Sequence, residues 1–174
     1  IAAYYGVEMK AVLTGFKYIG GEILKLEQAG EEYKSLFGFE ESCGYLKGTY
    51  ARDKDAVVAS MLIAEMAAYY SQKGKTLYDV MQELYKKHGV FAEETVSITM
   101  EGSEGIAKIK AIMEDIRINK PTSFGDFKVT AIRDYKTGIK YNLADNSEEI
   151  LTLPKSDVIY FELTNGASFV ARPS

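Results

Sequence analysis

The sequence predicts an α/β unit followed by an α+β unit. In the first half, short apolar runs alternate with helical patterns, which is the arrangement of βα units. In the second half, several strand-like segments accompany a single long helical pattern. The composition changes after Gly89. We therefore expect two domains, spanning residues 1–90 and 91–174.

The first expected elements are a helix end, a strand and a helix. Residues 2–5 run into Gly6, which is typical of a last helical turn with a glycine cap. Residues 6–13 alternate in polarity and predict a short strand. Residues 17–29 carry apolar side chains at helical spacing, and Gly30 follows as a stop. Strand followed by helix indicates a βα unit.

A second apolar run, residues 35–39, predicts a strand that leads directly into a loop beginning at Glu40. Open α/β sheets bind ligands at the carboxyl ends of their strands, so this loop is well placed for binding. Two helices should follow. One is capped by Asp53 or Asp55 and runs to about Ser71, and the other starts at Thr76 and ends before Gly89. We expect their methionines to fill the core and His88 to be structural.

The second half is expected to contain one helix and an antiparallel sheet. The helical pattern covers residues 101–118. Strands are predicted over residues 95–100, 127–135, 157–164 and 167–171.

Two turns are expected between strands of the second half. Asn165-Gly166 predicts a type I′ hairpin turn, because that dipeptide accepts positive φ angles. Residues 145–149 (Asp-Asn-Ser-Glu-Glu) superficially resemble a calcium loop. They lack its alternating ligands and central glycine, which favours a solvated turn.

The overall composition is that of an ordinary globular protein. Of 174 residues, 47% are apolar and 26% are charged, and the net charge is −4. This balance gives no basic surface for nucleic acid, and no apolar run is long enough to span a membrane. The single cysteine, Cys43, cannot form an internal disulfide; we expect it to pack, rather than to act as a nucleophile. Cytoplasmic localisation is expected.

The segment with the clearest chemistry is residues 38–46 (Gly-Phe-Glu-Glu-Ser-Cys-Gly-Tyr-Leu), followed by Arg52 and Lys54. Carboxylates accept hydrogen bonds from neighbouring hydroxyls, serine adds a hydroxyl, and the two cations can meet a phosphate. This is the chemistry that a sugar phosphate requires. On composition alone, a solvated turn would be the commoner explanation.

Residues 38–55 resemble the sugar-binding loop in the third domain of the α-D-phosphohexomutases, the phosphoglucomutase and phosphomannomutase family. Two other segments match this family in the expected order. Residues 13–20 (Leu-Thr-Gly-Phe-Lys-Tyr-Ile-Gly) are similar to its Thr-Gly-aromatic-Lys segment. Residues 171–174 (Ala-Arg-Pro-Ser) are similar to the start of its fourth-domain phosphate loop. Phe39 stands where other members have glycine.

The resemblance implies roles for matching residues. Glu40 and Ser42 would hold sugar hydroxyls, in a cleft that Thr14, Gly15 and Lys17 line. A basic pair near the sugar or its phosphate would consist of Arg52 and Lys54. The clamp for the non-reacting phosphate would use Arg172 and Ser174, although the remainder of the family's phosphate loop is absent from this sequence.

The resemblance also implies a reaction. A phosphoserine would donate to a hexose monophosphate, giving a glucose 1,6-bisphosphate intermediate that returns a phosphoryl group to the serine. None of the 174 residues matches the family's catalytic serine loop or its Mg²⁺ loop. We therefore expect no catalytic residue and no metal ligand here. The chain is expected to be the substrate-recognition part of a longer, Mg²⁺-dependent enzyme, partnered by preceding domains and inactive alone.

Three alternatives remain open at this stage. The first is a phosphoglucomutase or phosphomannomutase, which share the same sugar loop. The second is a phosphopentomutase or a hexose-bisphosphate synthase of the same superfamily. The third is a non-catalytic module that binds sugar phosphates.

Overall fold

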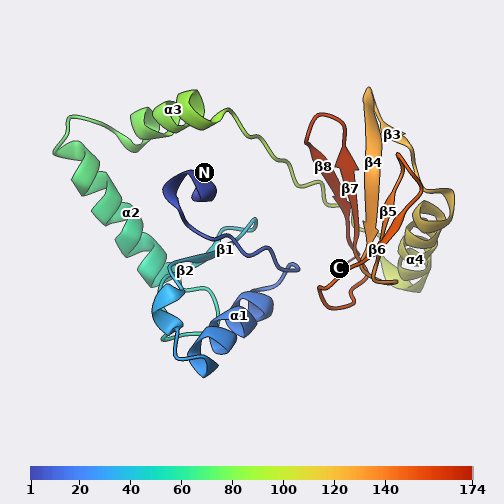
Figure 1. Ribbon diagram of the computed structural model, residues 1–174, viewed down its shortest axis with the longest axis horizontal. Helices are drawn as coiled ribbons and strands as arrows, with labels where there is room; N and C mark the ends of the chain where they lie inside the picture. Colours follow the sequence, from blue (N-terminus) through green and yellow to red (C-terminus); the bar gives the residue numbers. More distant parts are fainter. Residues whose placement is uncertain (174) are drawn as a thin grey trace. The chain divides into compact units, whose positions relative to one another are not determined.

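The computed structural model describes residues 1–173. The chain forms two compact units, Ile1–Glu94 and Thr95–Ser174 (Figure 1). The first unit contains five helical segments and a β-hairpin, and the second contains helix α4 and an antiparallel sheet. Both units thus contain helices and strands, as the sequence predicts for each half of the chain.

The first unit starts with the 3-10 helix η1 (Ala2–Tyr5), which ends at Gly6 with φ of 69°. The glycine cap is thereby confirmed. Helix α1 (Phe16–Gln28) follows, and then the short 3-10 helix η2 (Glu32–Lys34). Helix α1 buries Phe16 and Ile23 against Leu46, which gives the unit a small apolar core.

The Glu40 loop belongs to a β-hairpin. Strand β1 (Gly38–Glu40) pairs antiparallel with strand β2 (Gly44–Leu46), and Glu40 lies opposite Gly44. Sequence analysis predicted the first strand but missed the second. The loop therefore connects two adjacent strands, and Glu40 itself is the last residue of β1.

The next two helices begin at the expected caps. Helix α2 (Ala56–Ser71) starts at Asp55, whose carboxylate accepts from the amides of Val57 and Val58. Helix α3 (Leu77–His88) starts with a reciprocal capping box between Thr76 and Asp79. Both starts satisfy amide groups that have no partner inside the helix.

Helix α2 buries none of its residues in the described part of the chain, although most of its side chains are apolar. Met61 is 66% exposed, and Met66 and Met81 are also exposed. The expectation that these methionines fill a core is wrong for this chain. Strand β2 and helix α3 contact α2, but they bury none of its side chains.

The strand predicted for residues 6–13 is also absent. This segment is extended, but residues 8–13 make no backbone hydrogen bond with any other described residue. A strand requires a partner, and alternating polarity alone does not supply one. The first unit therefore shows helices and a two-stranded antiparallel hairpin, without the layered parallel sheet of a Rossmann-like domain.

The second unit is an antiparallel sheet with one helix. Helix α4 (Gly102–Asn119) precedes six strands. The sheet order is β6-β5-β4-β7-β8, and β3 pairs with β4. The strands are β3 (Ser123–Phe124), β4 (Phe127–Asp134), β5 (Ile139–Asn142), β6 (Glu148–Ile150), β7 (Ile159–Leu163) and β8 (Ser168–Ala171).

The core of the second unit lies between α4 and the sheet, where Figure 1 shows the helix against one face. Met113 of α4 packs with alternating residues of β4 and β7, among them Ile132 and Phe161. Phe161 is fully buried and contacts Phe124 edge to face, with ring centroids 5.0 Å apart. One helix on an antiparallel sheet was the predicted arrangement for this half.

Residues 95–100 do not form the predicted strand. Val96 and Ile98 are 74% and 73% exposed, and no described backbone group bonds to this segment. Its alternating pattern has no strand to pair with. Conversely, β3, β5 and β6 were not predicted, because they are short and carry few apolar residues in alternation.

The two predicted turns are present, with one difference. The β7–β8 hairpin closes through Gly166, whose amide donates to the carbonyl of Leu163 at 3.0 Å. Only Gly166 has positive φ there, so the turn is not type I′; a three-residue loop with glycine at its third position fits instead. At residues 145–147 the turn is exposed, as expected, while Glu148 already belongs to β6.

Candidate functional site

The centre of the candidate site is the pair formed by Glu40 and Lys54. The Glu40 side chain is only 10% exposed, and its Oε1 lies 3.5 Å from Nζ of Lys54. Lys54 comes from the segment after β2. This segment is held beside the hairpin because the amide of Asp55 donates to the carbonyl of Tyr45 at 2.8 Å. A carboxylate and an ammonium group thus meet at one end of the β1–β2 hairpin.

Charges around Lys54 favour its protonated state. A hydrogen bond from Lys54 to Asp53, together with the charges of Asp53 and Glu40, raises the pKa of the Lys54 ammonium. The backbone and side-chain donors of Lys54 in turn lower the pKa of the Asp53 carboxyl. These two shifts favour a protonated Lys54 beside an ionised Asp53.

Arg52 is held away from this pair. Its guanidinium donates to the Glu27 carboxylate on α1 and to the carbonyl of Thr49, and it lies 3.2 Å from the carbonyl of Ala51. The Arg52 guanidinium is therefore already paired with a carboxylate of α1. A phosphate at Arg52 would have to share or replace these partners.

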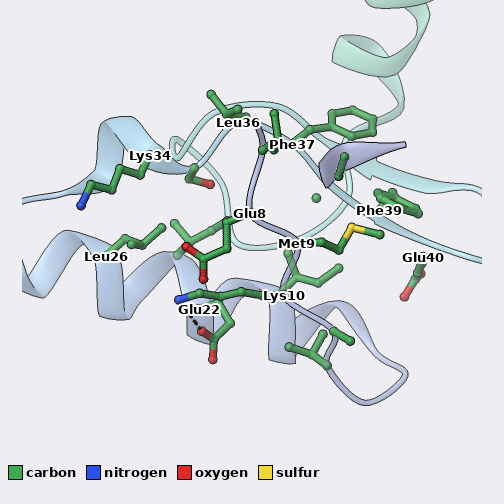
Figure 2. Close-up of a pocket in the computed structure, with 18 of the residues that line it drawn as sticks. Glu8, Met9, Lys10, Glu22, Leu26, Lys34, Leu36, Phe37, Phe39 and Glu40 are labelled. Atoms are coloured by element: carbon green, nitrogen blue, oxygen red, sulfur yellow. Dashed lines mark ion pairs between the residues drawn. The ribbon is translucent and has the colours of Figure 1, made fainter. Parts of the chain in front are cut away.

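A pocket of about 850 Å³ lies beside the hairpin (Figure 2). Residues of the extended segment before α1, of α1, of η2 and of β1 line it. Thr14, Gly15 and Glu40 all belong to this lining, so the structure brings these three predicted residues together. Glu40 lies at one end of the pocket in Figure 2, apart from the group of Glu8, Lys10 and Glu22.

Cations of this pocket are neutralised by neighbouring carboxylates. Lys10 Nζ lies 3.5 Å from Glu22 Oε2, and Lys34 Nζ lies 2.5 Å from Glu31 Oε1. The pKa of the Glu22 carboxyl is lowered, mainly by a hydrogen bond from Lys25. Apolar side chains, including Ile23, Leu26, Leu36 and Phe37, supply much of the remaining lining. Away from Glu40, the pocket therefore has an apolar character with paired charges.

The remaining predicted residues of this unit lie outside the pocket lining. Ser42 is exposed in the turn between β1 and β2, and Lys17 is exposed, with Nζ 5.0 Å from the Tyr18 ring centre. Cys43 is exposed with a φ of 61°, so its expected packing role is wrong. The chain reverses tightly between β1 and β2, and this reversal leaves the Cys43 side chain exposed to solvent.

The predicted phosphate clamp belongs to the second unit. Arg172 directly follows β8 and is exposed, and it forms no ion pair with the residues that the structure describes. Ser174 lies outside the described residues. Arg172 is thus accessible to a ligand.

Sequence reasoning missed two residues that shape the site. Glu27 holds Arg52 from a helix that is distant in sequence, so no local motif reveals the contact. Gly44 faces Glu40 across the hairpin, which becomes visible only once β2 is recognised as a strand.

Comparison with known proteins identifies the family of this chain. The family model described as "Phosphoglucomutase/phosphomannomutase, alpha/beta/alpha domain III" matches residues 1–88. This chain belongs to the phosphoglucomutase/phosphomannomutase family. Phosphoglucomutases of Staphylococcus epidermidis ATCC 35984 and Staphylococcus aureus RF122 are 40% and 41% identical to it over 175 aligned positions. Each match covers the whole chain, which spans 31% of the relatives' length. No solved structure gives a significant match.

Two features are absent from the described residues. In residues 1–173, no three His, Cys, Asp or Glu side chains gather closely enough to hold a metal ion. No helix in the described part of the chain combines the length and apolar character needed to cross a membrane.

Proposed function

We propose that this chain recognises the substrate in a phosphoglucomutase or phosphomannomutase that interconverts hexose 1-phosphates and hexose 6-phosphates. The observation that carries the proposal is the Glu40–Lys54 pair, formed in the segment that resembles the family's sugar loop. Thr14 and Gly15 share a pocket lining with Glu40, which supports a common site.

The proposed chemistry is recognition of a polyhydroxylated anion. Glu40 would accept hydrogen bonds from two neighbouring sugar hydroxyls, and Ser42 would add a donor and acceptor from the exposed turn. Lys54, and Arg52 after exchange of its Glu27 contact, would contact hydroxyl or phosphate oxygens. Lys17 is exposed at the start of α1 and is proposed to reach the same ligand.

Arg172 and Ser174 are proposed to hold the phosphate that does not react. A guanidinium suits this role, because its planar fork can bind two phosphate oxygens at once. The exposure of Arg172 directly after β8 supports the proposal. Gripping the sugar and the distal phosphate separately would let one enzyme accept its substrate in two opposite orientations.

Phosphoryl transfer depends mainly on positioning and on stabilisation of charge. We propose that the reacting phosphoserine and Mg²⁺ belong to a longer cytoplasmic enzyme, with glucose 1,6-bisphosphate as its intermediate. The described residues of this chain do not present a fitting set of Mg²⁺ ligands. Their proposed contribution is to bind and orient the sugar phosphate.

The other domains of such an enzyme are the proposed partners of this chain. Helix α2 supports this proposal, since it exposes apolar side chains on more than one side, including Val57, Met61, Ile63 and Tyr69. A helix that is apolar all round is normally buried. The matched relatives are about three times as long as this chain, and thus contain further domains that could cover it.

The proposal is tested by Glu40→Gln in the full-length mutase that carries this sequence. The substitution keeps the shape of the side chain but replaces a charged acceptor, and should weaken transition-state binding by about 1.5–3 kcal/mol. The measurement is kcat/KM for glucose 1-phosphate, alongside the melting temperature. Glu148→Gln, on the exposed strand β6, is the matched control. Unchanged kinetics in the Glu40 variant would remove the support for the sugar site.

Substrate preference requires a separate comparison. Turnover of glucose 1-phosphate, mannose 1-phosphate and ribose 1-phosphate by the same full-length enzyme distinguishes the hexomutases from a phosphopentomutase. The 174-residue chain alone should turn over none of them. Turnover by this chain alone would show that it contains a complete active site and contradict the proposed division of roles.

A further inference from the structure

Gly44 faces the candidate sugar site at a distance that leaves no room for a side chain. A Cβ atom placed on Gly44 would lie 2.8 Å from Oε1 of Glu40 and 2.8 Å from Cδ of Lys54. It would also approach Cγ of Glu40 to 2.9 Å. All three distances are shorter than ordinary van der Waals contact, which starts near 3.5 Å. Glu40 and Lys54 therefore occupy the space that a side chain at residue 44 would need.

The backbone at this position does not itself require glycine. Gly44 lies within β2, and it is not among the residues with positive φ. An alanine could adopt this backbone conformation without strain. The three closest contacts all involve flexible side chains, those of Glu40 and Lys54. The fold could accommodate a Cβ if the Glu40 carboxylate and the Lys54 stem moved.

These side chains are held by further contacts in their present positions. Lys54 Nζ lies 3.3 Å from Asp53 Oδ1 and 5.7 Å from the ring centre of Phe16. The Glu40 side chain is nine-tenths covered. Its carboxylate is thus fixed before any ligand binds, which reduces the ordering that a ligand would have to impose.

We infer that Gly44 is a positioning residue for the sugar-binding carboxylate. By having no side chain, it lets Glu40 and Lys54 meet across the hairpin in the geometry that receives the ligand. This inference rests on the proposed function, because it requires Glu40 to bind the sugar. It adds a residue that contacts no ligand itself and acts through the placement of the Glu40 carboxylate beside Lys54.

The test is Gly44→Ala in the full-length mutase, with glucose 6-phosphate as the ligand. A displaced carboxylate loses a charge-assisted hydrogen bond, so the Kd measured by calorimetry should rise about tenfold or more. The melting temperature should stay close to that of the unchanged protein. Gly21→Ala is the matched control, since a Cβ on Gly21 in α1 would contact no described atom within 4 Å.

A double-mutant cycle with Glu40→Gln separates the inference from the proposed function. If Gly44 acts through Glu40, the double variant should bind no more weakly than Glu40→Gln alone. An inert Glu40→Gln would overturn the proposed sugar site. A weakened Glu40→Gln with an inert Gly44→Ala would overturn only the inference. A large drop in melting temperature for Gly44→Ala, or additive losses in the cycle, would also overturn it by assigning Gly44 to the hairpin itself.

Discussion

Nε of Arg117 in α4 donates a hydrogen bond to Oδ1 of Asp134 in β4 at 3.2 Å. Both side chains are nearly buried, with 9% and 6% exposed. Burial opposes the charge of Arg117, but hydrogen bonds to Asp157 and Asp134 outweigh it and raise the pKa of the guanidinium. This contact joins the only helix described in the second unit to the middle of its sheet.

Asp134→Ala should destabilise the second unit by about 3 kcal/mol, because it removes the buried counter-charge of Arg117 and leaves only the more exposed Asp157 and Glu114. It also removes the acceptor for the amide of Lys136 and the hydroxyl of Thr137. Chemical denaturation measures the change. Glu149→Ala is the control, since the Glu149 side chain is 57% exposed and its pair with Lys140 should contribute at most about 1 kcal/mol. If both variants lost the same free energy of unfolding, burial of the Arg117–Asp134 pair would not contribute to stability.

Two adjacent glycines of α1 should respond in opposite directions to alanine. A Cβ on Gly20 would lie 2.8 Å from the backbone carbonyl oxygen of Arg52, whereas Gly21 faces open space. Gly20→Ala should destabilise the first unit by about 1–3 kcal/mol through overpacking. Gly21→Ala should stabilise it by up to about 1 kcal/mol through helix propensity. Melting temperatures of the two variants give the comparison, and a tolerated Gly20→Ala would contradict the close approach of α1 to the Arg52 segment.

The end of α3 is packed against η1 through His88. Its ring lies 5.1 Å from the Tyr4 ring centre and 6.0 Å from that of Tyr5, and Lys87 lies over the Tyr4 ring at 4.1 Å. His88 Nε2 is buried without a hydrogen-bond partner among the described residues. Desolvation, followed by the charge of Lys87, lowers the pKa of His88 from its usual 6.5.

The direction of the pH dependence follows from this lowered pKa. Well above pH 6.5, His88 is neutral in both the folded and unfolded states, and the contact is at full strength. As the pH falls below 6.5, the unfolded state takes up the proton first, so the first unit loses stability until the lower folded pKa is passed. The melting temperature should therefore decrease between pH 7 and pH 5. His88→Phe keeps an aromatic ring and should remove this part of the decrease; an unaltered pH profile would contradict the assignment.

Arg172→Lys tests the proposed phosphate clamp in the full-length mutase. Lysine retains the charge but loses the two-pronged geometry of the guanidinium, so hexose phosphates should bind more weakly. Because Arg172 is exposed, the free energy of unfolding should change by no more than about 0.5 kcal/mol, and the melting temperature should stay nearly the same. A large loss of stability with unchanged kinetics would identify Arg172 as a structural residue.

Local signals in the sequence predicted the helices well. Gly6, Asp55, Thr76 and Gly89 all mark helix ends as expected, because capping depends on residues that are neighbours in the chain. Strands were harder to predict. Residues 6–13 and 95–100 have the right alternation, but a strand also needs a partner, which a pattern cannot provide. The apolar helix α2 shows the same limit, since its composition indicates burial and its surroundings in this chain do not supply it.

The candidate site could be located from sequence because Glu40 and Lys54 lie in one continuous matching segment. Their ion pair and the shared pocket of Glu40 with Thr14 needed the structure. The contact between Glu27 and Arg52 could not be predicted, because it joins a helix to a distant loop with no recognisable motif.

The strand order of the second unit has a consequence for how it folds. Strands β4, β5 and β6 pair with their neighbours in sequence, as do β7 and β8, so these parts can form from local contacts. The pairing of β4 with β7 alone brings together strands far apart in the chain, and it completes the environment of Phe161. Loop-closure entropy makes such a non-local contact slow to form. We expect the β4–β7 pairing to set the folding rate of this unit, and core substitutions in these two strands to slow refolding more than those in β8.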